Sequence, residues 1–172
     1  MRIAIDAMGG DHAPAEIVKG AVQAAALYDV DIVLVGDEKA IRKTLPRSSS
    51  EAKRIQVRHT DEAIQMKDPA SAFRTRKDAS VCLCADMVRE RQADAMVSAG
   101  NTGAAMAVAT FKLGRIEGIE RPAIATEFPA LTGRTILLDV GANVDCEVSH
   151  LTSLRLWAAY TPRRLWASPS LG

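Results

Sequence analysis

The 172-residue chain has few cysteines, little net charge and no long hydrophobic run. Its cysteines are Cys82, Cys84 and Cys146, and an odd count at this spacing is typical neither of a metal site nor of a disulfide framework. We therefore expect reduced thiols and no bound metal. Cys82 and Cys84 would point in different directions on a helix, so at least one of them should pack as a small buried hydrophobe.

The lack of a charge excess and of a long apolar run argues against two kinds of partner. A formal net charge of +1, with 25% charged residues, does not predict binding to nucleic acid. No apolar stretch approaches the roughly 20 residues that cross a bilayer, and the N-terminus lacks the pattern of a signal peptide. We expect a cytoplasmic protein.

Several common catalytic motifs are also missing. The chain contains no P-loop, no dinucleotide-binding G-x-G-x-x-G, no G-x-S-x-G nucleophile elbow and no H-E-x-x-H zinc helix. Nucleotide-dependent, serine-hydrolase and zinc-protease functions therefore lose support, and no cofactor is predicted.

What the chain does contain is a regular alternation of strand and helix patterns. Short apolar runs that end at a turn predict strands, and apolar residues at helical spacing predict the helices between them. The strands are predicted at 2–6, 31–35, 55–58 and 95–98, and the helices at 14–29, 37–44, 80–91 and 102–113. This alternation predicts an α/β fold with a mostly parallel sheet covered on both faces.

Two further strand patterns and the C-terminal residues depart from this alternation. The runs at 123–128 and 135–139 are close enough to pair as a hairpin, which would add an antiparallel element to the sheet. Residues 152–172 hold both tryptophans of the chain and no acidic residue, and Pro162 is expected to interrupt a long helix there. We therefore predict one α/β domain at 1–150 and an aberrant, poorly ordered tail at 151–172.

Three glycine-rich segments, at 8–11, 98–103 and 139–145, each follow a predicted strand. In an open α/β sheet they would gather at the carboxyl ends of the strands, where ligands bind. Small residues let the backbone approach an anion, and a helix that begins near residue 101 would direct its free N–H groups at it. The candidate phosphate-binding residues are Gly9, Gly10, Ser98, Gly100, Asn101, Thr102, Gly103 and Gly141.

Polar side chains in and beside these segments are candidate catalytic residues. They are Asp6, His12, Asn101, Asp139 and Asn143. The imidazole of His12 titrates near neutral pH and could transfer a proton, but a histidine beside a helix start is also commonly a capping or surface residue. An aspartate at the end of a strand often only caps a helix or a turn. Both interpretations stay open.

A run of basic residues precedes the helix predicted at 80–91. Its members are Lys67, Arg74, Arg76 and Lys77. They could neutralise phosphate or contact an acidic partner protein, although such runs are most often solvated surface.

Six segments carry a resemblance to a known family through their order and spacing. They are IAIDAMGGDHAP at 3–14, MKDP at 66–69, KDAS at 77–80, VSAGNTGA at 97–104, GIERPAIA at 118–125 and DVGANVDC at 139–146. Together they resemble the acyl-carrier-protein:phosphate acyltransferases, the PlsX family, from residue 1 to about 151. The resemblance implies a Rossmann-like three-layer α/β/α sandwich. It also implies transfer of a fatty acyl group from acyl carrier protein to inorganic phosphate, giving acyl phosphate for phospholipid synthesis.

The resemblance further implies a homodimer that associates peripherally with the membrane. Phosphate is itself the nucleophile in this reaction, so the missing catalytic triad is consistent with it. Family members are considerably longer, so we expect a truncated sheet and impaired activity of this chain alone. Two alternatives stay open: a non-catalytic fragment that binds a complete subunit or acyl carrier protein, and an acyl-CoA:phosphate transferase.

Overall fold

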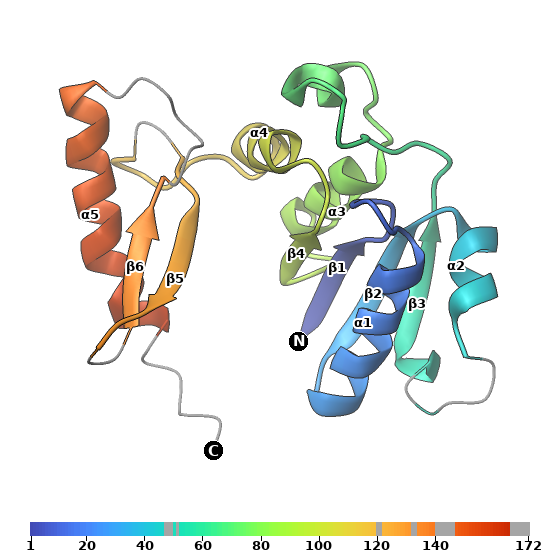
Figure 1. Ribbon diagram of the computed structural model, residues 1–172. Coiled ribbons are helices and arrows are strands. Elements are labelled where there is room, and N and C mark those ends of the chain that lie inside the picture. Colours follow the sequence, from blue (N-terminus) through green and yellow to red (C-terminus); the bar gives the residue numbers. More distant parts are fainter. Residues whose placement is uncertain (47–49, 51, 120–121, 132–133, 140–146, 166–172) are drawn as a thin grey trace. The chain divides into compact units, whose positions relative to one another are not determined.

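The computed structural model describes residues 1–46, 50, 52–119, 122–131, 134–139 and 147–165 (Figure 1). The chain forms two compact units, Met1–Gly114 and Arg115–Gly172. The sequence predicts one domain over 1–150, whereas the structure divides the chain after Gly114. Residues 114–118 are all exposed, and Gly114 and Gly118 have positive φ values of 86° and 81°. An exposed segment with two such glycines has little surface to bury, which explains the boundary.

The first unit is built on a four-stranded parallel sheet. Its strands are β1 (Arg2–Asp6), β2 (Asp31–Gly36), β3 (Ile55–His59) and β4 (Ala95–Ser98), in the order β3-β2-β1-β4. The register pairs Ile5 of β1 with Leu34 of β2 on one side and with Val97 of β4 on the other. The predicted strands agree with these bounds to within one residue at each end.

Within the described residues, three α-helices and two short 3-10 helices connect these strands, and a fourth α-helix follows β4. The α-helices are α1 (Ala15–Leu27), α2 (Glu38–Thr44), α3 (Ser80–Arg89) and α4 (Thr102–Lys112), and the 3-10 helices are Ala52–Arg54 and Ala70–Arg74. Helix α2 begins after Asp37, whose carboxylate accepts hydrogen bonds from the backbone N–H groups of Lys39 (2.9 Å) and Ala40 (3.2 Å). This is the capping that an aspartate supplies at a helix start.

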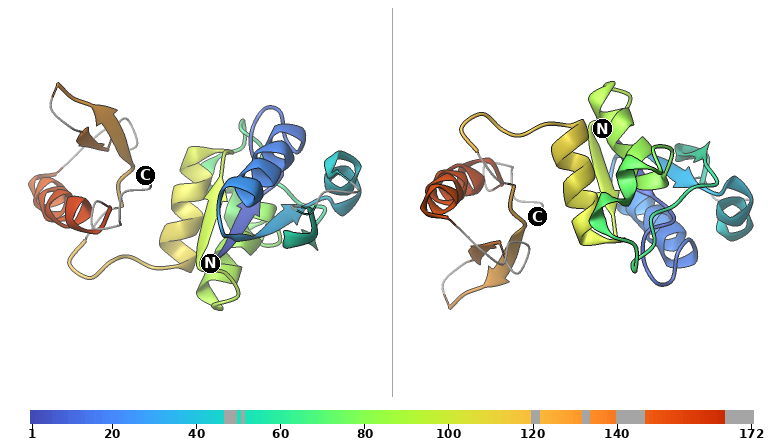
Figure 2. Two further views of the ribbon diagram at one scale, coloured as in Figure 1. Left: turned by 90° about the horizontal axis from the view of Figure 1, so that it is seen from below. Right: turned by 90° about the horizontal axis from the view of Figure 1, so that it is seen from above.

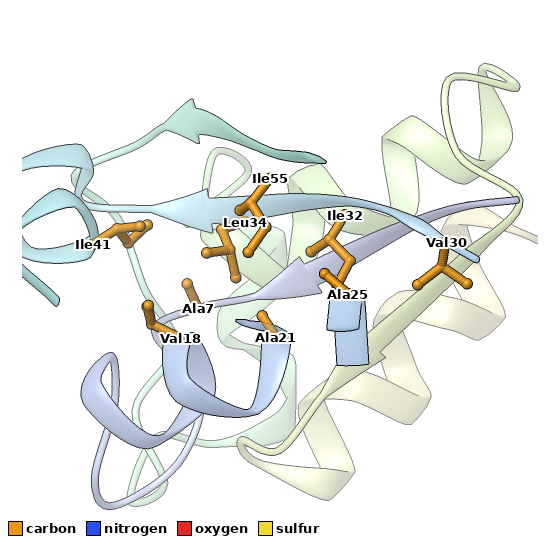
Figure 3. Close-up of a cluster of buried hydrophobic side chains, with 9 residues drawn as sticks. All are labelled: Ala7, Val18, Ala21, Ala25, Val30, Ile32, Leu34, Ile41 and Ile55. Atoms are coloured by element: carbon orange, nitrogen blue, oxygen red, sulfur yellow. The ribbon is translucent and has the colours of Figure 1, made fainter. Parts of the chain in front are cut away.

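The alternation of side chains along the strands separates two buried layers. Ala7 and the β2 residues Ile32 and Leu34 pack on α1 and α2 in one layer (Figure 3). Ala4 of β1 and Val35 of β2 point to the opposite face, where they pack on α3. Helices therefore cover both faces of the sheet, as the further views show (Figure 2). The predicted three-layer α/β/α architecture is confirmed for this unit.

The second unit contains a hairpin of β5 (Ala125–Pro129) and β6 (Arg134–Leu138), which pair antiparallel. The sequence correctly predicts the hairpin. It forms a two-stranded sheet of its own, however, and adds no antiparallel strand to the parallel sheet. Adjacent antiparallel strands form hydrogen bonds along their two facing edges, so β5 and β6 pair with each other without a strand of the parallel sheet.

A helix, α5 (Val148–Leu165), follows the hairpin. The sequence predicts a poorly ordered tail at 151–172; residues 151–165 belong to α5, and residues 166–172 lie outside the described part of the chain. A proline removes one backbone donor and distorts a helix without always ending it, which is why Pro162 is a weak stop signal. None of the helices within the described ranges is long and apolar enough to span a membrane.

The thiols of α3 lie inside the first unit. Cys82 and Cys84 are both free and buried, so both pack as small hydrophobes. Burial raises the pKa of Cys82 to about 11 and also raises the pKa of Cys84, so both stay protonated near neutral pH. The expectation for Cys146 falls outside the described residues.

Candidate anion-binding site

The site lies where the order of the parallel strands reverses. β1 has β2 on one side and β4 on the other, and the crossovers from β1 to β2 through α1 and from β3 to β4 through α3 lie on opposite faces of the sheet. In open α/β folds, ligands bind in the crevice outside the carboxyl ends of the two strands at such a reversal, which here are β1 and β4. The glycine segment 8–11 follows β1, and the segment 98–103 follows β4. Two of the three predicted glycine segments therefore meet at this crevice.

The backbones of the two segments touch at Gly9 and Gly100. A Cβ atom on Gly9 would lie 2.5 Å from Asp6 Oδ2 and 2.8 Å from the backbone N of Gly100. A Cβ atom on Gly100 would lie 2.9 Å from the Cα of Gly9. Side chains do not tolerate such approaches, so both positions require glycine because two main chains cross there. Gly10 is needed for a second reason, its positive φ of 108°.

Asp6 lies beneath this crossing, at the end of β1. The alternation of β1 puts it on the same face as Ala4, toward α3, and it is 3% exposed. Its Oδ1 accepts hydrogen bonds from Ser80 Oγ (2.6 Å) and from the backbone N of Met8 (3.2 Å). Its Oδ2 accepts one from Ser98 Oγ (2.7 Å). Both carboxylate oxygens are therefore bound to groups of the protein.

The direction of these hydrogen bonds determines what Ser98 can do. A carboxylate only accepts, so the hydroxyl groups of Ser80 and Ser98 both donate to Asp6. The oxygen of Ser98 is then left to accept, and the backbone N–H of Gly100 donates to it at 3.2 Å. The sequence prediction counted the Gly100 N–H among the anion donors. The structure directs it to Ser98 instead.

Asn101 caps α4 and ties it to a neighbouring loop. Its Oδ1 accepts a hydrogen bond from the backbone N of Ala104 at 2.9 Å. Its Nδ2 donates to the carbonyl oxygens of Asp68 (2.8 Å), Met66 (3.1 Å) and Gln65 (3.4 Å). The amide thus holds residues 65–68 against the start of the helix, so its contacts favour positioning over proton transfer.

The first turn of α4 leaves two backbone donors available. Asn101 takes the N–H of Ala104 and Ser98 takes that of Gly100, and within the part of the chain that is described the N–H groups of Thr102 and Gly103 have no acceptor. Unpaired first-turn N–H groups carry the positive end of the helix dipole and are suited to an anion. Of the predicted donors Gly100–Gly103, the backbone N–H of Asn101 likewise has no acceptor among the described residues, and anion binding by these groups stays a prediction.

The loop at 65–68 is also held by the carboxylate of one of its own residues, Asp68. Asp68 Oδ2 accepts a hydrogen bond from the backbone N of Gln65 at 2.7 Å and contacts the guanidinium group of Arg76. The hydrogen bond from Gln65, followed by that from Arg76, lowers the pKa of Asp68 from its ordinary value. Arg76 also donates to the carbonyl oxygen of Ala63 at 3.1 Å.

The basic residues before α3 therefore differ in their surroundings. Arg76 is part of the loop scaffold, and Arg74 lies over the rings of Phe73 and Phe111, 5.9 and 5.4 Å from their centroids. Lys67 and Lys77 are exposed, as the solvated-surface interpretation expects.

His12 and Asp139 have surroundings of their own. His12 is exposed, and its backbone O accepts a hydrogen bond from the N of Glu16 at 3.2 Å. Asp139 follows β6 in the second unit, has a positive φ of 61° and donates its backbone N–H to the O of Ile124 at 2.8 Å. Gly141 and Asn143 lie outside the described residues. A role for the third glycine segment at this site stays a prediction.

Sequence reasoning missed Ser80 and the loop at 65–68 as parts of the site. The segments KDAS and MKDP contain them, but a serine at a helix start normally indicates a cap. Ser80 is the first residue of α3, and its hydroxyl group donates to Asp6 on the underlying strand β1 rather than capping the helix. No local pattern could have revealed a partner so distant in the chain.

The fold defines a Rossmann-like α/β protein, with a candidate anion site of backbone donors at its topological switch point. Comparison with known proteins carries this further. The chain belongs to the family of fatty acid synthesis proteins, whose model matches residues 1–161. That match continues past Leu151, where the sequence analysis placed the start of an aberrant tail.

Relatives in this family are phosphate acyltransferases. The chain is 54% identical over 152 residues to the phosphate acyltransferase of Pelotomaculum thermopropionicum, which covers 88% of this chain and 44% of the relative. It is 50% identical over 152 residues to that of Desulfitobacterium hafniense (strain DSM 10664 / DCB-2), covering 88% and 45%. It is 45% identical over 171 residues to that of Desulforamulus reducens, covering 99% and 51%. The chain thus spans about half the length of these relatives.

Proposed function

We propose that this chain supplies the phosphate-binding part of a phosphate acyltransferase, which moves a fatty acyl group from acyl carrier protein to inorganic phosphate. One observation carries the proposal. The two unpaired first-turn N–H groups of α4, at Thr102 and Gly103, lie at the switch point of a chain whose relatives are phosphate acyltransferases. A main-chain site of this kind accepts a tetrahedral anion without a metal or a nucleotide motif.

The chemistry of the reaction suits a site made mainly of main-chain donors. An oxygen of phosphate attacks the thioester carbonyl carbon, and the new C–O bond turns the carbonyl into an oxyanion. Collapse of this intermediate breaks the C–S bond, releases acyl phosphate and leaves a thiolate that takes up a proton. Because phosphate is the nucleophile, the protein has to orient it and stabilise the developing charge.

The contacts support different roles for the candidate residues. Asp6 and Asn101 are proposed as positioning residues, since their oxygen and nitrogen atoms are bound to groups of the protein. His12 and Asp139 are retained as proposed catalytic residues because a proton donor to the leaving thiolate is still required, and Asn143 is retained because its amide could hydrogen-bond to the reacting groups. Gly141 is retained as a proposed phosphate contact.

The partners of the whole protein are part of the same proposal. We propose acyl carrier protein as the donor, a homodimeric assembly and a cytoplasmic location with peripheral attachment to the membrane. Membership of the fatty acid synthesis family supports a fatty acyl donor. Comparing acyl carrier protein and CoA thioesters as donors distinguishes this proposal from a small-acyl CoA enzyme, and co-elution with a full-length subunit tests the non-catalytic alternative.

The activity itself is tested with purified protein. The chain and the full-length enzyme of Desulfitobacterium hafniense are each given acyl carrier protein thioester and inorganic phosphate, and acyl phosphate is trapped with hydroxylamine. We expect turnover by the long enzyme and much slower turnover by this chain. Equal rates would contradict the proposed impairment. Failure of the chain to bind inorganic phosphate in a calorimetric titration would contradict the proposed phosphate-binding role.

A further inference from the structure

One buried group in the first unit has a place that the proposed reaction does not explain. Ser80 is 1% exposed and lies at the first position of α3, where its hydroxyl group makes no cap for the helix. It donates instead to Asp6 Oδ1 at 2.6 Å. A polar side chain this deeply buried destabilises the fold unless its hydrogen bond is made. The bond to Asp6 is therefore needed wherever Ser80 is kept.

This hydrogen bond begins a chain of contacts that ends at the anion site. Ser80 donates to Asp6, whose other carboxylate oxygen accepts from Ser98 Oγ at 2.7 Å, and Ser98 in turn accepts from the N–H of Gly100 at 3.2 Å. Gly100 immediately precedes Asn101, the cap of α4. Each link is a donor bound to an acceptor, so the loss of one hydrogen bond changes what the next group in the chain of contacts can bind.

We propose that Ser80 is a positioning residue for phosphate binding, acting through Asp6 and Ser98 on the loop that presents the N–H groups of Thr102 and Gly103. The inference rests on the proposed function, because it concerns the affinity of that same site. Asp6 has two oxygen atoms to satisfy and little access to water. With Ser80 in place, one oxygen is occupied and the other is directed at Ser98.

Loss of the Ser80 hydroxyl would remove one of the hydrogen bonds that the Asp6 carboxylate accepts. Asp6 Oδ1 would keep only the backbone N–H of Met8, at 3.2 Å, in a site from which water is largely excluded, and rotation of the carboxylate toward other donors would release Ser98. Ser98 would then no longer hold the N–H of Gly100 inward. The loop would then adopt conformations in which the N–H groups of Thr102 and Gly103 do not point at the same phosphate. Only part of the molecules would be able to bind, so the apparent affinity for phosphate would fall.

A neighbouring hydroxyl group provides a matched control. Thr60 is 8% exposed, donates to the O of Asp78 at 2.7 Å and accepts from the backbone N of Glu62 at 3.2 Å. Its hydroxyl group therefore binds backbone groups in the segment that leads into α3, and its hydrogen bonds do not go to Asp6. Replacing it with valine removes a buried hydroxyl group at similar cost to stability without touching the chain of contacts.

The experiment compares Ser80→Ala, Ser80→Thr and Thr60→Val in the 172-residue chain. Inorganic phosphate is titrated by calorimetry into each folded variant, and exchange of the Gly100 amide proton is followed by NMR. We expect Ser80→Ala to weaken phosphate binding about tenfold, which matches the loss of one hydrogen bond to a charged group. Ser80→Thr, which keeps the hydroxyl, should recover most of the affinity. Thr60→Val should bind like the parent chain.

The amide of Gly100 separates this inference from the proposed function. It should exchange faster in Ser80→Ala and not in Thr60→Val, whether or not phosphate binds. If the parent chain binds no phosphate, the proposed function fails, and the Gly100 exchange rates still decide the positioning role. Unchanged exchange in Ser80→Ala, or equal effects of Ser80→Ala and Thr60→Val, would overturn it. If Ser80→Ala does not fold, the parent chain must show a protected Ser80 hydroxyl proton, and its absence would overturn the inference.

Discussion

The two units of the chain differ in how well they cover their own apolar residues. In the first unit, five of the six residues of β2 are buried, and Leu34 is 0% exposed. In the second, every residue of β5 is exposed, and Leu131 of the hairpin turn is 107% exposed. Helices on both faces of a parallel sheet bury it completely, whereas one hairpin with one helix has too few layers to do so. We infer that most of the folding free energy resides in the first unit, which also contains the candidate site.

Hydrogen exchange gives the largest expected contrast. Amides in β1 and β2 should exchange at least ~1000-fold more slowly than those in β5 and β6, because core amides open only with unfolding of the whole unit. The measurement is exchange of the native chain followed by NMR or mass spectrometry. Equal protection in the two units would show that the hairpin is stabilised as strongly as the parallel sheet, and the comparison would fail.

Two leucine substitutions test the same contrast energetically. Leu34→Ala removes a fully buried side chain and should lower the free energy of unfolding by about 2–5 kcal/mol. Leu137→Ala, at a position that is 43% exposed, should cost less than ~1 kcal/mol. Urea unfolding is followed by far-UV circular dichroism for the first. Tryptophan fluorescence follows the second, since both tryptophans lie in the second unit. Similar costs would contradict the comparison.

Two glycine substitutions compare a crowded with an open position inside the first unit. Gly9→Ala places a Cβ atom 2.8 Å from the backbone N of Gly100 and should destabilise by about 1–3 kcal/mol, with a loss of phosphate affinity. Gly20→Ala in α1 meets nothing within 4 Å and should stabilise by about 0.5–1 kcal/mol. Opposite signs in thermal unfolding are the expected result. A neutral Gly9→Ala would mean that the two loops do not cross as described.

The smallest effect is a response of the loop at 65–68 to acid. The folded-state pKa of Asp68 is lowered below its ordinary value of 3.8, first by the backbone N–H of Gln65 and then by Arg76. Ionised Asp68 therefore stabilises the loop above about pH 4, and this contribution is lost as the pH falls through the lower folded-state value.

An NMR titration checks this response. The amide of Gln65 should shift with pH below about 4 in the parent chain and not in Asp68→Asn. Amides of β2 serve as the control and should stay unchanged over the same range. Identical titrations in the two proteins would contradict the assignment.

The parallel sheet and its helices could be predicted from the sequence because their signals are local. Apolar alternation and the turns after residues 6, 36 and 98 give the strands, and Asp37 and Asn101 are recognisable caps. The glycine segments after β1 and β4 follow from the same pattern, since the carboxyl ends of parallel strands share an edge.

The rest of the site depends on contacts that join distant parts of the chain. Ser80 meets Asp6 only because β1 lies beneath the start of α3, and Asn101 meets Asp68 only because an irregular loop returns to α4. Neither pair shows a local period. The division at Gly114 was missed for a related reason, since a boundary depends on which surfaces find partners and not on the pattern of any single element.

The contact between Gly9 and Gly100 also limits how this site can change over time. Most packing contacts can drift by small steps, because a smaller residue on one side makes room for a larger one on the other. Here both partners are already the smallest residue, so neither can yield to the other. A larger residue at one of the two positions cannot be accommodated by a smaller residue at the other. A redesigned site would have to move a whole strand end, whereas the side chains around the crossing are open to gradual substitution.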